Sequence, residues 1–257
     1  MESFDREGEL LTLGVDTSTE KRSVALLRGR SLLAESVSEL REGGSASLLS
    51  DIERVLASVP VKLRDVGLFA AAVGPGSFTG LRAGLATIKG LALVLKKPVV
   101  GIPTLHAVAY GARPAERVVA LIPAGRGEVF AQLLGVDEEG RVTEHEPPAH
   151  LPPASLLEKV VRLGAGVTWA GGGAFKFKEL IQQAAASAGI EFVEEPGADA
   201  SSGAWRLARA EEALARNVIA LALRRVGEPG GASAGDLSAI YVRPSDAELK
   251  EQWHAQS

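Results

Sequence analysis

The sequence predicts an α/β protein built from two lobes, each with a mixed sheet covered by helices. In the first hundred residues, short apolar runs and amphipathic stretches follow one another in the order β-β-β-α-β-α-β. A similar alternation starts again after Pro103. The 257 residues include 46% hydrophobic and 23% charged ones, a composition that is typical of folded domains and sufficient for two cores.

The first half shows the clearest pattern. Arg28-Gly29-Arg30 separates two apolar runs and predicts a hairpin turn. Apolar residues then recur every three or four positions up to Pro60, which predicts an amphipathic helix that ends there. The expected elements are strands over residues 10–15, 23–27, 32–37 and 66–73, helices over 45–59 and 81–95, and a strand that begins at Pro98.

The second half repeats the alternation with a proline-rich loop near residue 150. Ser155 and Glu158 have the spacing of a capping box, which predicts a helix over 156–163. The other expected elements are strands over 118–122, 129–136, 168–170 and 239–242, and helices over 174–188 and 205–226.

Composition excludes several classes of function. The chain has no cysteine, so disulfides, thiolate catalysis and cysteine-ligated zinc are excluded, and its four histidines have no metal-ligand spacing. A formal net charge of −4 argues against a strongly basic surface with which the chain itself would bind nucleic acid. Residues 1–9 lack the apolar core of a signal peptide, and the apolar runs 66–73 and 90–100 are too short to span a membrane. We therefore expect a cytoplasmic protein without a membrane partner.

The stretch from Gly74 to Gly80 has the composition of a phosphate loop or a nucleophile turn. It lacks the lysine of a P-loop, the third glycine of a Rossmann fingerprint and the G-x-S-x-G spacing of a nucleophile elbow. We expect a tight turn from strand to helix, with Ser77 or Thr79 as the helix N-cap, and no catalytic residue.

Small residues occupy one face of the helix that follows this turn: Gly80, Ala83, Gly84, Thr87 and Gly90. Each glycine costs a helix about 0.5–1 kcal/mol relative to alanine, so three of them need a reason. Two explanations remain open, namely close packing on the helix's own sheet, or an interface with another helix. Asp16, at the end of the first strand, is likewise either a turn former or a ligand for a metal or phosphate.

Four stretches carry a resemblance to a known family. Gly74-Pro75-Gly76-Ser77-Phe78-Thr79-Gly80-Leu81-Arg82, with Gly84 two residues later, is similar to the glycine-rich motif of the bacterial TsaB family, also called YeaZ. "LGVDTSTEKRSVALL", "GIPTLHAVA" and "IYVRPSDAELK" resemble other parts of that family in order and spacing. The resemblance extends from about residue 11 to residue 250.

The resemblance implies a two-lobed actin-like ATPase fold, shared with sugar kinases and Hsp70, with lobes at 1–103 and 104–257 and a final tail that packs back on the first lobe. It implies a non-catalytic subunit that binds and supports TsaD, the transferase that forms threonylcarbamoyladenosine at position 37 of tRNAs. TsaE, an ATPase, joins the pair, the subunit forms a homodimer when alone, and tRNA is contacted only through the complex. No cofactor is expected to bind this chain firmly, with ATP or ADP at the complex interface.

The family also implies candidate sites. Asp16, Thr17 and Ser18 are the candidate cofactor residues, and no metal ligand is expected. The partner interface is expected on the first-lobe helices, at Leu48, Leu49, Ile52, Gly76, Phe78, Gly80, Ala83, Gly84, Thr87 and Gly90. On this basis Gly84→Leu is expected to weaken the complex without unfolding the chain.

The sequence departs from the family pattern at two places. Gly44-Ser45 stands where members often carry His-Ser. Residues 123–130 lack the family's aspartate, and the family's arginine is either displaced, to Arg126, or lost. These changes put in doubt a contribution of the second lobe to a shared active site. The alternatives are an ATP-using kinase or hydrolase of the same fold that employs Asp16, or a diverged homodimeric paralogue.

Overall fold

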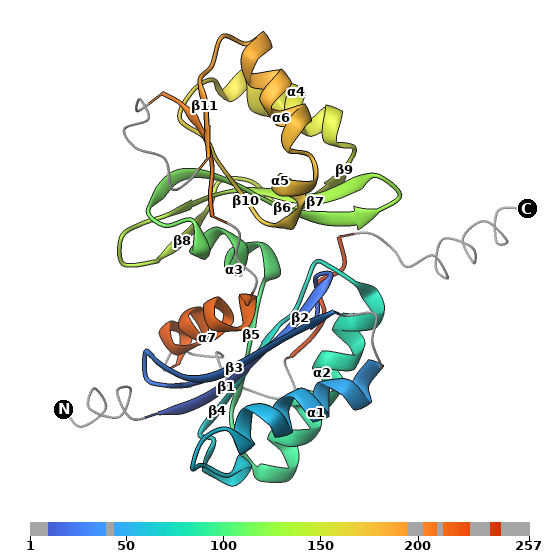
Figure 1. The fold of residues 1–257 in the computed structure, drawn as a ribbon, viewed down its shortest axis with the longest axis vertical. Helices are drawn as coiled ribbons and strands as arrows, with labels where there is room; N and C mark the ends of the chain where they lie inside the picture. The colour runs from blue at the N-terminus through green and yellow to red at the C-terminus, as the bar shows by residue number, and fades with distance from the viewer. Residues whose placement is uncertain (1–9, 40–43, 195–202, 210–212, 227–236, 243–257) are drawn as a thin grey trace, which may run out of the picture.

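Two mixed sheets, one above the other, form the body of the molecule (Figure 1). The computed structural model describes residues 10–39, 44–194, 203–209, 213–226 and 237–242. The first sheet has the strand order β3-β2-β1-β4-β5. Its strands are β1 (Leu11–Asp16), β2 (Lys21–Arg28), β3 (Ser31–Glu39), β4 (Leu68–Ala72) and β5 (Val99–Ile102). β1 is antiparallel to β2 and parallel to β4.

The second sheet repeats this arrangement. Its order is β11-β12-β10-β6-β7-β8, with β9 also paired to β7. β6 is antiparallel to β7 and parallel to β10. In the first sheet, β1 is likewise antiparallel to β2 and parallel to β4. The strands are β6 (Ala115–Gly125), β7 (Glu128–Val136), β8 (Val142–Glu144), β9 (Ala149–Leu151), β10 (Thr168–Ala170), β11 (Phe192–Glu194) and β12 (Trp205–Leu207). The two lobes therefore share the arrangement of five strands, to which the second sheet adds β9 and the edge strand β11.

Helices cover the outer face of each sheet and fill the space between the two (Figure 1). α1 (Gly44–Ala57) and α2 (Phe78–Leu95) lie together on the first sheet, with the short 3-10 helix η1 (Leu63–Asp65) nearby. α4 (Pro153–Leu163), α5 (Gly172–Lys176) and α6 (Lys178–Ser187) cover the second sheet. α3 (Thr104–Gly111) and α7 (Leu214–Arg225) lie between the lobes.

The packing of α7 joins the two lobes. This helix belongs to the C-terminal half of the chain but packs on β1, β2, β4 and β5 of the first sheet. A side chain at Gly14 of β1 would place its Cβ 2.4 Å from Ile219, so glycine permits the close approach. The Ala215 amide donates a 3.0 Å hydrogen bond to the buried Ser23 hydroxyl, and Asn217 donates to the Ala107 carbonyl of α3. One apolar core therefore extends across both lobes.

Several expectations for the second half are wrong. The helix expected over 205–226 is a strand, β12, followed after a connection by the shorter helix α7. Trp205 is fully buried against Trp169, with ring centroids 5.2 Å apart, and its strand pairs with β10 and β11. The helix expected over 174–188 is divided at Phe177 into α5 and α6. α3, β8, β9 and β11 were not predicted.

Two local expectations also need correction. α4 begins at Pro153, two residues before Ser155, and no side chain caps its start, so the predicted capping box is absent. Residues 239–242 do not form a strand, although the Ile240 amide donates a 2.7 Å hydrogen bond to the Val73 carbonyl. Leu237 is buried in the first-lobe core. The tail from residue 243 onward lies outside the described residues.

Candidate functional site

The turn that follows β1 is held by hydrogen bonds of its own residues. Asp16 is 1% exposed, and its Oδ1 accepts from the Ser18 amide at 2.9 Å and from the Ser18 hydroxyl. The Thr19 hydroxyl lies 3.1 Å from the other carboxylate oxygen. Both oxygens of Asp16 are thus engaged by the turn, as expected of a turn former. The cofactor role of Asp16, Thr17 and Ser18 stays a prediction.

The glycine-rich turn before α2 packs directly on this first turn. The Ser77 amide donates a 2.7 Å hydrogen bond to the Ser18 carbonyl, and a Cβ at Gly76 would lie 2.2 Å from that same oxygen. Gly74 has a φ of +105° and faces the Ile240 carbonyl. The Ser77 hydroxyl accepts from the Gly80 amide at 3.2 Å, which confirms Ser77 as the N-cap of α2. Backbone packing and capping therefore account for this motif.

α2 presents two different faces. The inner face is buried on the sheet and consists of Gly80, Leu81, Gly84, Leu85, Ile88 and Ala92. A Cβ at Gly84 would lie 2.1 Å from the Thr17 hydroxyl oxygen. We therefore expect Gly84→Leu to destabilise the first lobe, so this variant does not probe the interface alone. The predicted interface residues Leu48, Ile52, Gly80 and Gly84 lie inside the first lobe and not on its free surface.

The outer face of α2 is free among the described residues. Its members are exposed or half-buried and recur every three or four positions: Thr79, Ala83, Ala86, Thr87, Gly90, Leu93 and Val94, which we call the α2 surface. Leu93 is 66% and Val94 81% exposed, and Leu49 on neighbouring α1 is 44% exposed. No atom of the described residues lies within 4 Å of a Cβ built at Gly90. An exposed apolar strip of this kind is typical of a protein interaction site.

The sequence analysis missed Leu93 and Val94, the most exposed large apolar residues of this surface. The signal was present, because residues 91–95 are all apolar. A surface helix buries one stripe, so an unbroken apolar run leaves some residues facing outward. By length and composition α2 passes the test for a membrane span, as core helices of folded domains also do, and its inner face is occupied by the sheet.

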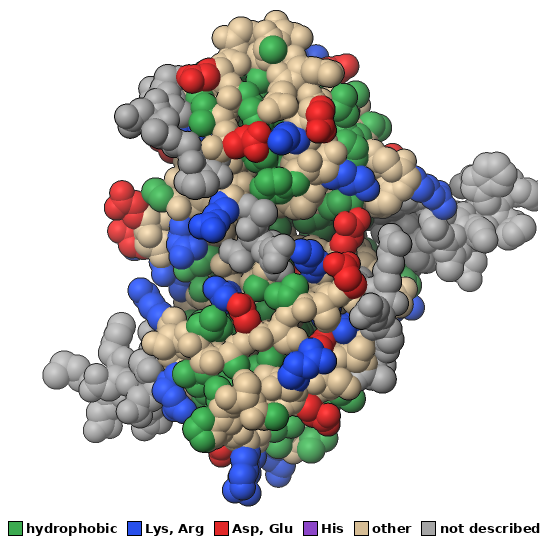
Figure 2. All heavy atoms as spheres, viewed as in Figure 1, with side chains coloured by type: hydrophobic (Ala, Val, Ile, Leu, Met, Phe, Trp, Pro, Cys, Tyr) green, Lys and Arg blue, Asp and Glu red, His purple; other side chains and the backbone are tan. Residues whose placement is uncertain are grey.

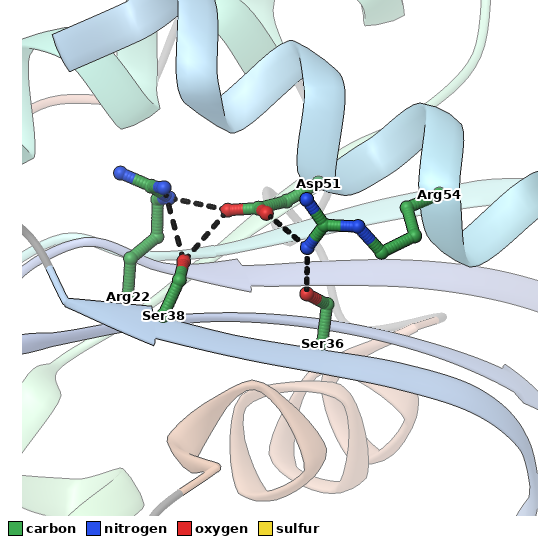
Figure 3. Close-up of polar contacts among 5 residues, drawn as sticks. All are labelled: Arg22, Ser36, Ser38, Asp51 and Arg54. Atoms are coloured by element: carbon green, nitrogen blue, oxygen red, sulfur yellow. Dashed lines mark hydrogen bonds and ion pairs between the residues drawn. The ribbon is translucent and has the colours of Figure 1, made fainter. Parts of the chain in front are cut away.

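A buried polar network fixes α1 next to this surface (Figure 3). Asp51 of α1 accepts from Arg22 of β2 at 2.6 Å and from the Ser38 hydroxyl of β3 at 2.9 Å. The side chains of Arg22 and Asp51 are 3% and 4% exposed. Arg54 bridges the other Asp51 oxygen, at 2.9 Å, to Ser36. α1 is thus attached to two strands through one carboxylate.

A cavity of about 230 Å³ opens between the lobes. Its walls are mainly apolar and include Val108, Ile122, Ala170, Phe175 and Leu214, with Lys21 and Arg209 among the lining charges. Gly171 and Gly172 bring backbone close to it. Among the described residues, no three His, Asp or Glu side chains come together in a way that would hold a metal ion.

Burial raises the pKa of Asp16 above the usual value of an aspartate, while the hydrogen bonds from Ser18 and Thr19 oppose that rise. We therefore expect Asp16→Asn to become more stable relative to the wild type as the pH rises from about 4 to 8. A carboxyl group with a raised folded-state pKa stabilises the fold below its unfolded pKa, and this contribution is lost as the pH rises through the raised value. Urea unfolding across this range measures the difference, and a pH-independent difference contradicts the raised pKa.

The amino-acid comparisons identify relatives of this chain. Residues 42–198 match the family model described as TsaD: tRNA N6-adenosine threonylcarbamoyltransferase. The tRNA threonylcarbamoyladenosine biosynthesis protein TsaB of Escherichia coli (strain K12) is 36% identical over 154 residues, or 59% of this chain and 66% of that protein. TsaB of Bacillus subtilis (strain 168) is 26% identical over 179 residues, or 69% of this chain and 78% of that protein.

The structural comparison agrees along almost the whole length. YeaZ from Pseudomonas aeruginosa superposes with a TM-score of 0.68 and 26% identity, covering 90% of this chain and 99% of that one. A ROK family protein from Streptococcus pneumoniae TIGR4 superposes with a TM-score of 0.52 at 10% identity. This similarity shows a common fold and nothing further. The predicted two-lobed actin-like ATPase fold, with a mixed sheet in each lobe, is confirmed.

Proposed function

The chain belongs to the TsaB (YeaZ) family, which acts in tRNA threonylcarbamoyladenosine biosynthesis, and from this premise we propose that it is a non-catalytic subunit that binds the TsaD transferase. In this proposal the subunit supports TsaD while TsaD forms threonylcarbamoyladenosine at position 37 of tRNAs. The chain itself has no catalytic residue in this proposal.

The α2 surface is the observation that carries the proposal. Leu93 is 66% and Val94 81% exposed to water. Full burial of a leucine or valine side chain stabilises a protein or a complex by about 1.5–3 kcal/mol, so a partner that covers both residues would gain binding free energy. Ala83, Ala86 and Gly90 carry little or no side chain, so another helix backbone can approach closely along the same face. A helix from a partner would bury both features together.

Two further observations support the choice of a binding role over an ATP-using enzyme. The polar network around Asp51 attaches α1 to β2 and β3, and α1 packs beside α2 on the same sheet, so the docking site is preformed. Asp16, on which the kinase or hydrolase alternative depends, has both carboxylate oxygens engaged by its own turn.

The remaining elements of the proposal concern the assembly. We place the protein in the cytoplasm, with TsaE as a further partner and tRNA contacted only through the complex. ATP or ADP binds at the complex interface and not firmly to this chain. When TsaD is absent, the chain pairs with itself.

Leu93→Asp combined with Val94→Asp is expected to abolish the complex with TsaD from the same organism. Each aspartate buried in an apolar interface without a partner costs about 2 kcal/mol or more, which is roughly a 30-fold loss of affinity. Gel filtration of the mixed proteins measures binding, and threonylcarbamoyladenosine formation by the reconstituted enzymes should fall in parallel.

Leu180→Asp is the matched control, because Leu180 is 44% exposed on α6 of the other lobe. This variant should bind TsaD as the wild type does. If wild-type chain and TsaD elute separately, the proposed function fails. If the double variant binds normally, the α2 surface is not the docking site.

A further inference from the structure

The charges of α2 and of the residues that end it all have one sign. Residues 78–97 include Arg82, Lys89, Lys96 and Lys97 and contain no aspartate or glutamate, although the whole chain carries a formal net charge of −4. Arg82 and Lys96 are exposed, and Lys89 and Lys97 are half-buried. Figure 2 shows basic side chains at the lower end of the first lobe, where α2 ends in Figure 1.

These cations have no acidic partner within the part of the chain that the structure describes. Arg82 stacks over the Phe78 ring, with its guanidinium carbon 3.9 Å from the ring centroid, and Phe78 in turn lies 5.4 Å from the Tyr241 ring. The stack holds a positive charge at the N-terminal end of the α2 surface. The three lysines place positive charge at its C-terminal end. Neighbouring α1 has two acidic side chains: Glu53 is exposed, whereas Asp51 is buried and paired with Arg54.

We propose, on the basis of the proposed function, that the α2 surface selects a TsaD whose docking helices carry carboxylates opposite both cationic ends. The same charges would disfavour pairing of this chain with itself. In a symmetric homodimer built on this face, a positive end meets a positive end whether the two α2 helices run parallel or antiparallel. The apolar strip supplies affinity for either partner, and the cationic ends discriminate between them.

The first test uses wild-type protein alone and with TsaD at ionic strengths from about 0.05 to 0.5 M. Salt screens exposed charges, so affinity for TsaD should fall as salt is added. Self-association, measured by sedimentation equilibrium, should strengthen over the same range because the repulsion is screened. The opposite slopes are the expected result, and slopes of the same sign overturn the proposal.

The second test reverses the charge at one end with Lys89→Glu and Lys97→Glu. Affinity for TsaD at low salt should fall roughly tenfold, and the neutral pair Lys89→Gln and Lys97→Gln should show a smaller loss in the same direction. Thermal unfolding checks that each variant is folded. The matched control is Arg162→Glu with Lys176→Glu, an equal charge change on exposed residues of α4 and α5.

The outcomes separate this inference from the proposed function. If wild-type chain and TsaD do not associate at any salt concentration, the proposed function fails. If they associate but the glutamate pair binds no more weakly than the control pair, TsaD docking stands and selection by charge is overturned.

Discussion

Replacing Asp51 by alanine is expected to lower the free energy of unfolding by about 3–5 kcal/mol. The substitution leaves the guanidinium of Arg22, which is 3% exposed, in the interior without its counter-ion. One nitrogen of that group, Nη1, already has no hydrogen-bond partner among the described residues. The substitution also removes the acceptor for Ser38 and Arg54, so α1 loses its polar attachment to β2 and β3.

Urea unfolding at neutral pH measures this loss. Glu53→Ala is the control, because Glu53 is exposed on the same helix and a surface substitution of this kind usually changes stability by less than about 0.5 kcal/mol. A double replacement, Arg22→Met with Asp51→Leu, should recover most of the stability, because no buried charge remains unpaired. A loss below about 1 kcal/mol for Asp51→Ala would show that water reaches Arg22 and that the network does not anchor α1.

The same glycine-to-alanine change is expected to have opposite effects at two positions of α2. Gly84→Ala should destabilise the fold by about 1–3 kcal/mol, because the new Cβ would lie 2.1 Å from the Thr17 hydroxyl oxygen. Gly90→Ala should stabilise it by about 0.5–1 kcal/mol, because the site is open and alanine is the better helix former.

The two variants act as controls for each other, since they share one helix and one change in composition. Denaturant unfolding gives the difference directly. If both substitutions shift stability in the same direction, the assignment of an inner and an outer face to α2 is wrong.

The sequence predicted the first lobe well because its signals are local. Each strand and helix there has a regular apolar pattern and a clear boundary residue, such as Gly29 in the hairpin or Ser77 at the start of α2. In the second lobe, residues 205–226 have helical spacing throughout, yet Trp205 is in a strand. Pairing with β10 and contact with Trp169 outweigh helix propensity there.

The glycine-rich segment shows where local reasoning ends. Motif spacing argued against a P-loop and a nucleophile elbow, but it did not separate Gly84 from Gly90. Both belong to one run of small residues in the sequence. Their roles differ because one faces the turn after β1, and that contact joins residues 67 positions apart.

The sequence by itself determined the alternation of elements in the first lobe, the absence of cysteine chemistry, the position of a turn and helix start near Ser77 and the similarity to one family. These follow from composition and from interactions between near neighbours along the chain. Only the tertiary structure decided that α7 returns to the first sheet, that Asp51 neutralises Arg22, and that Leu93 and Val94 remain exposed. Burial is a property of the packed molecule, because it depends on which distant segments meet and not on the residues themselves.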